Sequence, residues 1–311
     1  MSFSVKVEKG TVKPVEKKDF KLGITHGGKF HADDAMGCAI LAILTEGKIE
    51  FERVLDVPDD IDNDTIVFDI GRGKFDHHQE DAPMRPTQHG EDPEVTHKYA
   101  ASGLLWKAFG DMITGDTRVT REVDMDLIRY IDEQDNGEDT NLLSTQIGKF
   151  MPPWNSDKTM DEQFIKVVEM CIMLLSNTIE SSKAKYAAEE IVKTTIKNQE
   201  NPNIVVFDTY LPAIEYIIDE NEFRSGYSKI LYMVFPSKRG GWSINAVSVK
   251  GDRFKQIMPF PEEWRGKEGE ELAKLTDGHA KFVHSVGFCA TAWTKEDAIA
   301  LAEKSIAMQM R

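Results

Sequence analysis

The sequence has little cysteine, no long apolar run and a deficit of positive charge. Its three cysteines, Cys38, Cys171 and Cys289, form no CxxC pair, which argues against a disulfide framework or a cysteine zinc site. We expect them to be small core residues. No apolar run approaches the roughly 18 residues of a membrane span, and the N-terminal residues resemble neither a signal nor a transit peptide. We therefore predict a cytoplasmic protein without a membrane partner.

Acidic residues outnumber basic ones by 53 to 38, which gives a formal net charge of -15. Such a surface repels polyanions, so extended, non-specific binding to nucleic acid is disfavoured and short anionic substrates are favoured. Residues 227–258 differ, because they contain six lysines and arginines, including Lys238 and Arg239, against the single acid Asp252. We predict that an anionic substrate is held there. The alternative for Lys238 and Arg239 is a solvated turn between two strands.

Strand and helix patterns alternate in the first half of the chain. Apolar and β-branched runs predict strands at 21–25, 52–57 and 65–70, and helical periodicity predicts helices at 35–47, 98–113 and 121–137. This alternation predicts an α/β fold with an open, mostly parallel sheet and helices on both faces. In such sheets ligands bind beyond the carboxyl ends of the strands.

The second half has a different organisation. A long amphipathic pattern covers 161–199 without a strand signal, and turn residues follow at Asn201. Beyond them strands and helices mix, which predicts a smaller α+β domain. The predicted parts are a first domain at 1–160, a helical connector at 161–200 and a second domain at 201–311.

Four potential metal ligands crowd one loop directly after the first predicted strand. The loop reads His26-Gly-Gly-Lys-Phe-His31-Ala-Asp33-Asp34. Histidine with carboxylate suits manganese, iron(II) or zinc better than calcium. The alternative is that the histidines are plain loop residues and that an aspartate caps the following helix. We assign that capping or supporting role to Asp34.

A second group of ligands follows the strand predicted at 65–70. Asp69 ends an apolar run, and the triplet Asp76-His77-His78 comes seven residues later. A turn between them lets Asp69 and His77 approach one centre, while the neighbouring imidazole acts as support. A third acidic group, Asp132 and Asp135, ends a helical pattern, where acids are unfavourable against the helix dipole unless a cation is near. A solvated acidic face is the alternative for that group.

The order of these motifs resembles that of the DHH phosphoesterase superfamily. Longer segments, among them THGGKFHADDA, the DHHQ tetrad and YIDEQDNG, resemble its melanocyte-proliferating-gene (Myg) branch over nearly the whole chain. The motifs that carry the resemblance are His31-Ala-Asp33, Asp69-Ile-Gly, Asp76-His77-His78, Ala101-Ser102-Gly103-Leu104, and Asp132 with Asp135.

The resemblance implies a metal-binding catalytic domain followed by a substrate-binding domain. It implies two Mn²⁺ or Mg²⁺ ions per chain and cleavage of a phosphodiester, with RNA exonuclease activity associated with the branch. By motif, the implied metal ligands are His26 or His31, Asp33, Asp69, His77 and Asp135. The usual superfamily pattern in the first motif is His-x-x-x-Asp-x-Asp, whereas here one His-x-Asp unit is followed directly by a second acid. Which of His26, His31 and Asp34 contacts metal therefore stays open.

Two divalent ions roughly 3.5–4 Å apart can activate a water and stabilise charge on a phosphoryl group. Asp69 is best placed to hold both ions, and we expect His78 to orient a ligand or meet the substrate. Cations of the second domain, Lys238 and Arg239, would neutralise the phosphate.

Two further segments of the second domain suggest contacts with substrate. His284, before a glycine in FVHSVGF, could donate to a substrate phosphate, although a buried, satisfied histidine fits equally. In Trp264-Arg265-Gly266 the arginine could pair with a phosphate and the tryptophan could stack on a base, although tryptophan more often packs in a core.

The motifs predict a phosphodiesterase that acts on phosphoester bonds, and the resemblance implies a 3'-5' exonuclease acting on RNA or short oligonucleotides. One alternative is a manganese-dependent hydrolase of pyrophosphate or another small phosphoanhydride. Another alternative is a non-catalytic protein in which the metal ions stabilise the fold and the second domain binds a partner. The oligomeric state is not predicted.

Overall fold

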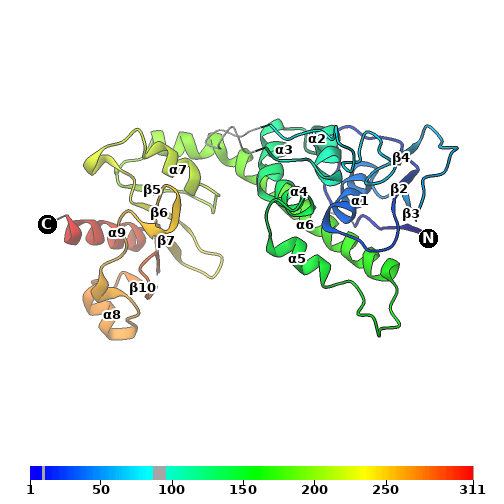
Figure 1. Ribbon diagram of the computed structural model, residues 1–311. Coiled ribbons are helices and arrows are strands. Elements are labelled where there is room, and N and C mark those ends of the chain that lie inside the picture. The colour runs from blue at the N-terminus through cyan, green and yellow to red at the C-terminus, as the bar shows by residue number, and fades with distance from the viewer. Residues whose placement is uncertain (9–10, 87–95, 311) are drawn as a thin grey trace. The chain divides into compact units, whose positions relative to one another are not determined.

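The computed structural model describes residues 1–8, 11–86 and 96–310 (Figure 1). They form two compact units, Met1–Lys183 and Ala184–Arg311. Within the described ranges, no helix is both long and apolar enough to cross a membrane. The three-part division of the chain stays a prediction.

The first unit contains a four-stranded sheet. Its strands, in spatial order, are β1 (Ser2–Ser4), β3 (Glu50–Val54), β2 (Leu22–His26) and β4 (Thr65–Val67). β2 pairs in parallel with both β3 and β4, and β1 is an antiparallel edge strand. The predicted open, mostly parallel sheet is confirmed. Because β2 and β4 are parallel neighbours, the residues that follow them meet at one edge of the sheet.

The first unit also contains helices, and the last of them continues into the second unit. They are α1 (Ala32–Leu44), α2 (Ala101–Thr114), α3 (Thr117–Val123), the π-helical turn η1 (Asp124–Ile128), α4 (Arg129–Asp135), α5 (Leu142–Gly148) and α6 (Met160–Lys197). Every residue of α1 is buried. A Cβ at Gly37 would lie 2.7 Å from Phe68 and 3.0 Å from Leu105, so α1 packs closely against both the end of β4 and α2.

The second unit contains a five-stranded, mostly antiparallel sheet. Its strands, in spatial order, are β10 (Ala280–Val283), β11 (Cys289–Ala292), β7 (Trp242–Ala246), β6 (Tyr232–Pro236) and β5 (Ile204–Val206), and β8 (Ser248–Val249) pairs separately with β9 (Asp252–Gln256). Its helices are α7 (Ile214–Glu220), α8 (Gly269–Leu275) and α9 (Lys295–Gln309), with 3-10 turns η2 (Gly226–Ser228) and η3 (Glu262–Trp264). The predicted α+β character is confirmed.

Alternation along β6 gives the second unit a core on each face of its sheet. Tyr232 and Val234 lie in one cluster, and Met233 and Phe235 lie in the other. Trp264 is fully buried in the first of these clusters. It is therefore a core residue, and the alternative that it stacks on a base is wrong. Cys38 and Cys171 are buried as expected, whereas Cys289 is only half-buried.

The close packing of α2 against α4 leads to a first testable prediction, which concerns the stability of a variant at Gly103. A Cβ at Gly103 would lie 1.8 Å from Oδ2 of Asp132, and the Gly103 N–H donates to Asp132 Oδ1 at 3.0 Å. Gly103→Ala should therefore lower the free energy of unfolding by about 1–3 kcal/mol, because Asp132 must shift. Urea unfolding measures the change. The matched control is Gly148→Ala in α5, where no atom lies within 4 Å of a Cβ. Equal losses in the two variants would contradict the steric explanation.

Candidate metal centre

The carboxyl edge of the first sheet gathers histidines and aspartates from four segments. His26 is the last residue of β2, and Asp33 and Asp34 lie in the first turn of α1. Asp69 lies just beyond β4 and is followed by the loop that carries His77. The fourth segment is the end of α4, which supplies Asp135.

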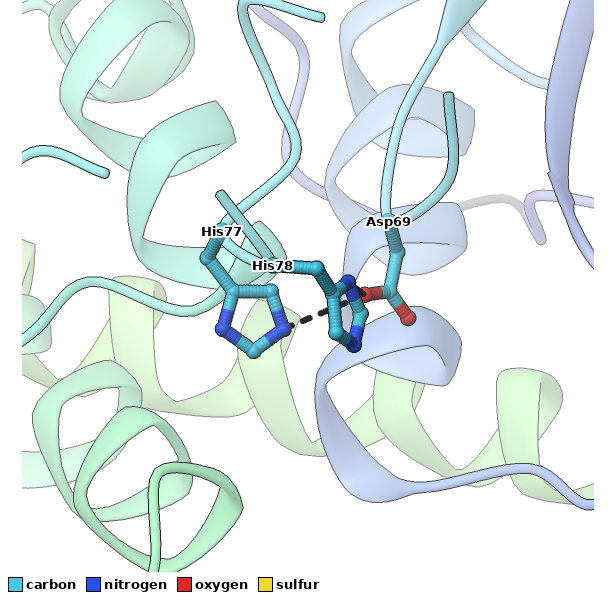
Figure 2. A group of neighbouring side chains, drawn as sticks. All are labelled: Asp69, His77 and His78. Atoms are coloured by element: carbon cyan, nitrogen blue, oxygen red, sulfur yellow. Dashed lines mark ion pairs between the residues drawn. The ribbon is translucent and has the colours of Figure 1, made fainter. Parts of the chain in front are cut away.

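Asp69 lies at the middle of this group. Its Oδ2 is 3.2 Å from Nε2 of His26, and its Oδ1 is 3.3 Å from Nε2 of His77. Figure 2 shows the side chains of Asp69, His77 and His78 pointing toward one another from the loop after β4. The backbone φ of Asp69 is +57°, a region that aspartate and asparagine tolerate better than most residues. Each carboxylate oxygen of Asp69 thus faces a different imidazole.

Three sets of side chains place their ligand atoms within 4.8 Å of one another. The sets are His26, Asp34 and Asp69; Asp69, His77 and His78; and His31, Asp33 and Asp135. The first two sets share Asp69. In addition, His77 Nε2 lies 3.3 Å from Asp135 Oδ2 and 3.7 Å from Asp33 Oδ2, which joins the second and third sets.

Several buried polar atoms in these sets have no hydrogen-bond partner in the described part of the chain. They are Oδ1 of Asp33, Oδ2 of Asp34, both carboxylate oxygens of Asp69 and Nε2 of His77. Buried polar atoms are usually paired, since leaving them unpaired costs free energy. Their concentration at one place, with a mixed histidine and carboxylate donor set, fits a site for divalent cations.

The imidazoles are oriented so that Nε2 faces the carboxylates. Nδ1 of His26 is 3.1 Å from the carbonyl oxygen of Gly27, and Nδ1 of His77 is 3.4 Å from Oδ1 of Asn136. Since these oxygens accept, each Nδ1 carries a proton, so either ring, once neutral, has its lone pair on Nε2. Such an outer contact is how metal-binding histidines are usually fixed. Asn136 was not identified from the sequence, although it directly follows Asp135.

Asp34 makes two kinds of contact, of which the sequence pattern indicated one. Its Oδ1 accepts from the N–H groups of His31, at 3.1 Å, and Ala35, at 2.7 Å, as expected of a residue that caps α1. Its Oδ2 lies 3.2 Å from Nε2 of His26. Asp34 therefore also belongs to the cluster, and its predicted supporting role is too narrow a description of these contacts.

His31 and His78 lie at the open side of the cluster, with side chains 57% and 59% exposed. Nδ1 of His31 is 3.7 Å from Oδ1 of Asp135. Nδ1 of His78 is 2.7 Å from Oδ1 of Asp76, whose other oxygen accepts from the Arg72 N–H at 2.6 Å. Asp76 thus fixes both the backbone of the loop at Arg72 and the orientation of the His78 ring.

Asp132 lies outside the three sets and has a full set of partners. It accepts from Nε and Nη2 of Arg85 at 2.9 and 2.6 Å, and from the Ser102 hydroxyl at 2.9 Å. Burial raises its pKa to about 7 although Arg85 opposes the shift. These contacts join α4 to α2 and to the segment before α2.

Arg53 supports the loop that carries His26 and His31. Its guanidinium donates to the Gly28 carbonyl oxygen at 2.9 Å, pairs with Asp161 and lies 4.3 Å from the centroid of the Phe164 ring. No sequence motif pointed to it. Its contacts reach residues far along the chain, which no local pattern could indicate.

The other predicted site residues belong to the second unit. Lys238 and Arg239 are exposed on the turn between β6 and β7. Nε of Arg265 donates to the carbonyl oxygen of Phe260 at 2.8 Å, and Nδ1 of His284 accepts from the Val286 N–H at 3.1 Å. The His284 ring is also 4.5 Å from that of Phe288. Their roles toward substrate stay predictions.

The charges of the cluster shift its titration strongly. Burial and the charge of Asp69 raise the pKa of Asp34 to about 8, and burial with the charges of Asp69 and Asp135 raises that of Asp33. Burial opposes protonation of His26, but the carboxylates of Asp69 and Asp34 outweigh it and raise its pKa to about 9. Without a metal, the cluster therefore retains protons near neutral pH.

A family model named MYG1_exonuc and described as an uncharacterised protein family (UPF0160) matches residues 23–306. The chain belongs to this family. The predicted resemblance to the Myg family is thereby confirmed. Some relatives of the chain are named MYG1 exonuclease, which agrees with the predicted class of enzyme, a hydrolase of phosphoester bonds.

Individual relatives are distant but similar over most of their length. The chain is 26% identical to the MYG1 protein of Dictyostelium discoideum, over 91% of this chain and 95% of that protein. It is 24% identical to the MYG1 exonuclease of Homo sapiens, over 92% and 85%. Among solved structures, RecJ from Thermus thermophilus in complex with Mn²⁺ is 12% identical, with a TM-score of 0.26 over 93% of this chain and 52% of that one. The chain thus spans about half of RecJ.

The shifted pKa values of the cluster predict how stability depends on pH. His26 and Asp34 both have folded-state pKa values above their ordinary ones, so the folded metal-free chain binds protons that the unfolded chain releases. Stability should therefore fall as pH rises from about 6.5, the ordinary pKa of histidine, to about 9, that of folded His26. Melting temperatures of chelator-treated protein across this range test the sign.

Bound metal should reverse this trend in part, because it replaces the protons. The stabilisation by Mn²⁺, taken as the difference between loaded and chelator-treated protein, should increase over the same pH range. Parallel pH profiles with and without Mn²⁺ would show that the cluster does not exchange protons for metal.

Proposed function

We propose that the chain is a divalent-metal-dependent phosphodiesterase, a 3'-5' exonuclease acting on RNA or short oligonucleotides. The observation that carries the proposal is the placement of Asp69, whose two buried oxygens face His26 on one side and His77 on the other. A carboxylate with this surrounding is suited to join two cations. We propose two Mn²⁺ or Mg²⁺ ions per chain.

The proposed metal ligands form two groups that share Asp69. His26 and Asp34 would hold one cation with it, and His77, Asp33 and Asp135 would hold the other, with His31 at the exposed side. When bound, such a pair of cations supplies an activated water and stabilises negative charge on a phosphoryl group. Burial of Asp33, Asp34 and Asp69 keeps their charges poorly solvated, which strengthens their attraction for cations.

The side chains of the cluster have separate tasks in this proposal. His78 is exposed beside Asp69, and Asp76 fixes its ring through Nδ1, so that Nε2 is left to donate to a substrate phosphate oxygen. We propose that Asp69 and His78 are the catalytic residues of the first unit. In the second unit, we propose Lys238, Arg239, Arg265 and His284 as the groups that hold the phosphate.

The direct test is a panel of substrates assayed with Mn²⁺. We expect stepwise release of mononucleotides from a labelled RNA oligonucleotide, and loss of that activity with excess EDTA. Phosphate release from pyrophosphate without oligonucleotide cleavage would instead identify a phosphoanhydride hydrolase. No turnover of either substrate by metal-loaded protein would indicate a binding module.

A pair of substitutions ranks Asp69 against His78. Asp69→Asn should abolish turnover and lower the metal content, because it removes charge from the position that both cations share. Asparagine tolerates positive φ, so the backbone at this position is preserved. His78→Ala should reduce activity by roughly 10–100-fold and keep both ions, because His78 is proposed to contact the substrate phosphate and not a cation. Elemental analysis distinguishes the cases. Two ions retained in Asp69→Asn but fewer in His78→Ala would reverse the assignment.

The basic turn of the second unit can be tested separately. Replacing Lys238 and Arg239 by alanine should weaken oligonucleotide binding and reduce the slope of log affinity against log salt by about 0.7 for each phosphate that these side chains neutralise. Binding is measured by fluorescence anisotropy at several salt concentrations. The exposed Lys255 in β9, replaced by alanine, is a control from the same basic stretch. Unchanged affinity and slope in the double variant would show that other residues bind the phosphates.

A further inference from the structure

The basic stretch at 227–258 is divided between the two ends of β6. Lys238 and Arg239 follow the last residue of this strand, whereas Lys229 precedes its first residue. A strand of five residues extends over about 17 Å, so Lys229 does not share a site with the turn at Lys238. Lys229 instead lines a separate cavity.

This cavity has a volume of about 440 Å³ and is lined by residues of the second unit alone. Its walls are the end of α7 with the residues that follow it, the segment before β6, and the strands β8 and β9. The volume is within the range of roughly 300–1,000 Å³ that is typical of small-molecule sites. The cavity therefore has room for a small ligand.

Positive side chains predominate among the described residues that line the cavity. Glu222 is the one acid among them, and the cations are Arg224, Lys229, Lys250 and Lys255. Arg224 and Lys250 are each paired with a glutamate. Lys229 and Lys255 have no carboxylate partner in the described part of the chain. Two positive charges are thus left for an anionic ligand.

Uncharged polar groups of β8 and β9 complete the site. Ser248 and Gln256 are paired opposite each other in these strands, so their side chains lie on the same face. Neither side chain hydrogen-bonds to another described residue, and neither is among the polar atoms closed off from solvent. A hydroxyl and an amide beside two free lysines can donate to the oxygens of a phosphate.

The backbone on both sides of Lys229 is fixed to the end of α7. The Asn221 side chain donates to the Ile230 carbonyl oxygen and accepts from the Ile230 N–H, both at 2.8 Å. On the other side, Nη1 of Arg224 donates to the Ser228 carbonyl oxygen at 3.3 Å. Because this segment is already ordered, binding through Lys229 requires little further ordering of the chain.

The surroundings of the cavity favour a small anion over a long polyanion. Asp219 and Glu222 lie beside Lys250, and Asp252 begins β9. All three acids are exposed, so a nucleic acid that crossed this surface would be repelled by them. Ile218 and Ile257 are half-buried in the lining and suit the carbon skeleton of a small molecule.

We propose that this cavity is a second ligand site, which binds a small phosphomonoester. Lys229 and Lys255 would pair with the phosphate, and Ser248 and Gln256 would hydrogen-bond to its oxygens or to hydroxyl groups of the attached skeleton. The inference goes beyond the proposed function and does not rest on it, since the site contains neither the metal centre nor the turn at Lys238.

The test uses ribose 5-phosphate as the probe and ribose as its uncharged counterpart. Calorimetry measures their binding to the full-length chain, once loaded with Mg²⁺ and once treated with EDTA. We expect one molecule of ribose 5-phosphate per chain in EDTA, where the metal centre cannot hold a phosphate, and no binding of ribose. Sulfate, a competing dianion, should weaken the binding.

Two variants remove one charge each and keep an apolar side chain. Lys229→Met and Lys255→Met should each weaken the binding of ribose 5-phosphate roughly tenfold, as expected for loss of a hydrogen bond to a charged group. The matched control is Lys274→Met, an exposed lysine of α8 outside the cavity, which should keep the wild-type affinity. Melting temperatures establish that the variants are folded.

Three results would overturn the proposal. The first is no binding of ribose 5-phosphate in EDTA, and the second is wild-type affinity in both Lys229→Met and Lys255→Met. The third is loss of this binding when Lys238 and Arg239 are replaced by alanine, which would place the phosphate at the turn after β6. Failure of the proposed function is distinguishable, because it would appear as absent oligonucleotide cleavage with the binding of ribose 5-phosphate intact.

Discussion

Repulsion between carboxylates in one buried place is the constraint on which the first unit depends. Asp33, Asp34 and Asp69 are all buried, and burial together with the charge of Asp69 raises the pKa of Asp33 and of Asp34. His26 and His77 balance part of this charge when they are protonated. Uncompensated charge in such a place is unfavourable, so the cluster must hold either protons or cations. Its affinity for divalent metal follows from the same repulsion.

The scaffold keeps the carboxylates together because each is carried by a fixed element. β2 and β4 are parallel neighbours, which brings His26 and Asp69 to one edge, and α1 begins directly behind them with Asp34 capping its first turn. Contacts behind the cluster fix its orientation: Asn136 holds His77, and Arg53 holds the loop after β2. Sites placed on strands and helices and backed by such contacts keep their geometry better than sites on free loops.

The sequence predicted those features that are written in local patterns. Asp69 was recognisable because an apolar, β-branched run ends at it. The helical spacing of apolar residues in other segments of the first half predicted the helices. The second contact of Asp34 could not be predicted, because capping and ligation use the same residue type at the same position. The role of Arg53 depends on contacts with Gly28 and Asp161, which only the folded chain brings together. Helix α5 was not predicted, because its seven residues form only about two turns, which is too few to show a helical pattern of apolar residues.

Electron paramagnetic resonance of the chain titrated with Mn²⁺ tests most directly whether Asp69 joins two ions. Two Mn²⁺ ions that share a carboxylate couple magnetically, so the signal of isolated ions should be replaced as the second equivalent binds. The predicted result is saturation at two ions per chain with the spectrum of a coupled pair. Saturation at one ion, or two ions that keep the spectrum of isolated Mn²⁺, would contradict a centre built around Asp69.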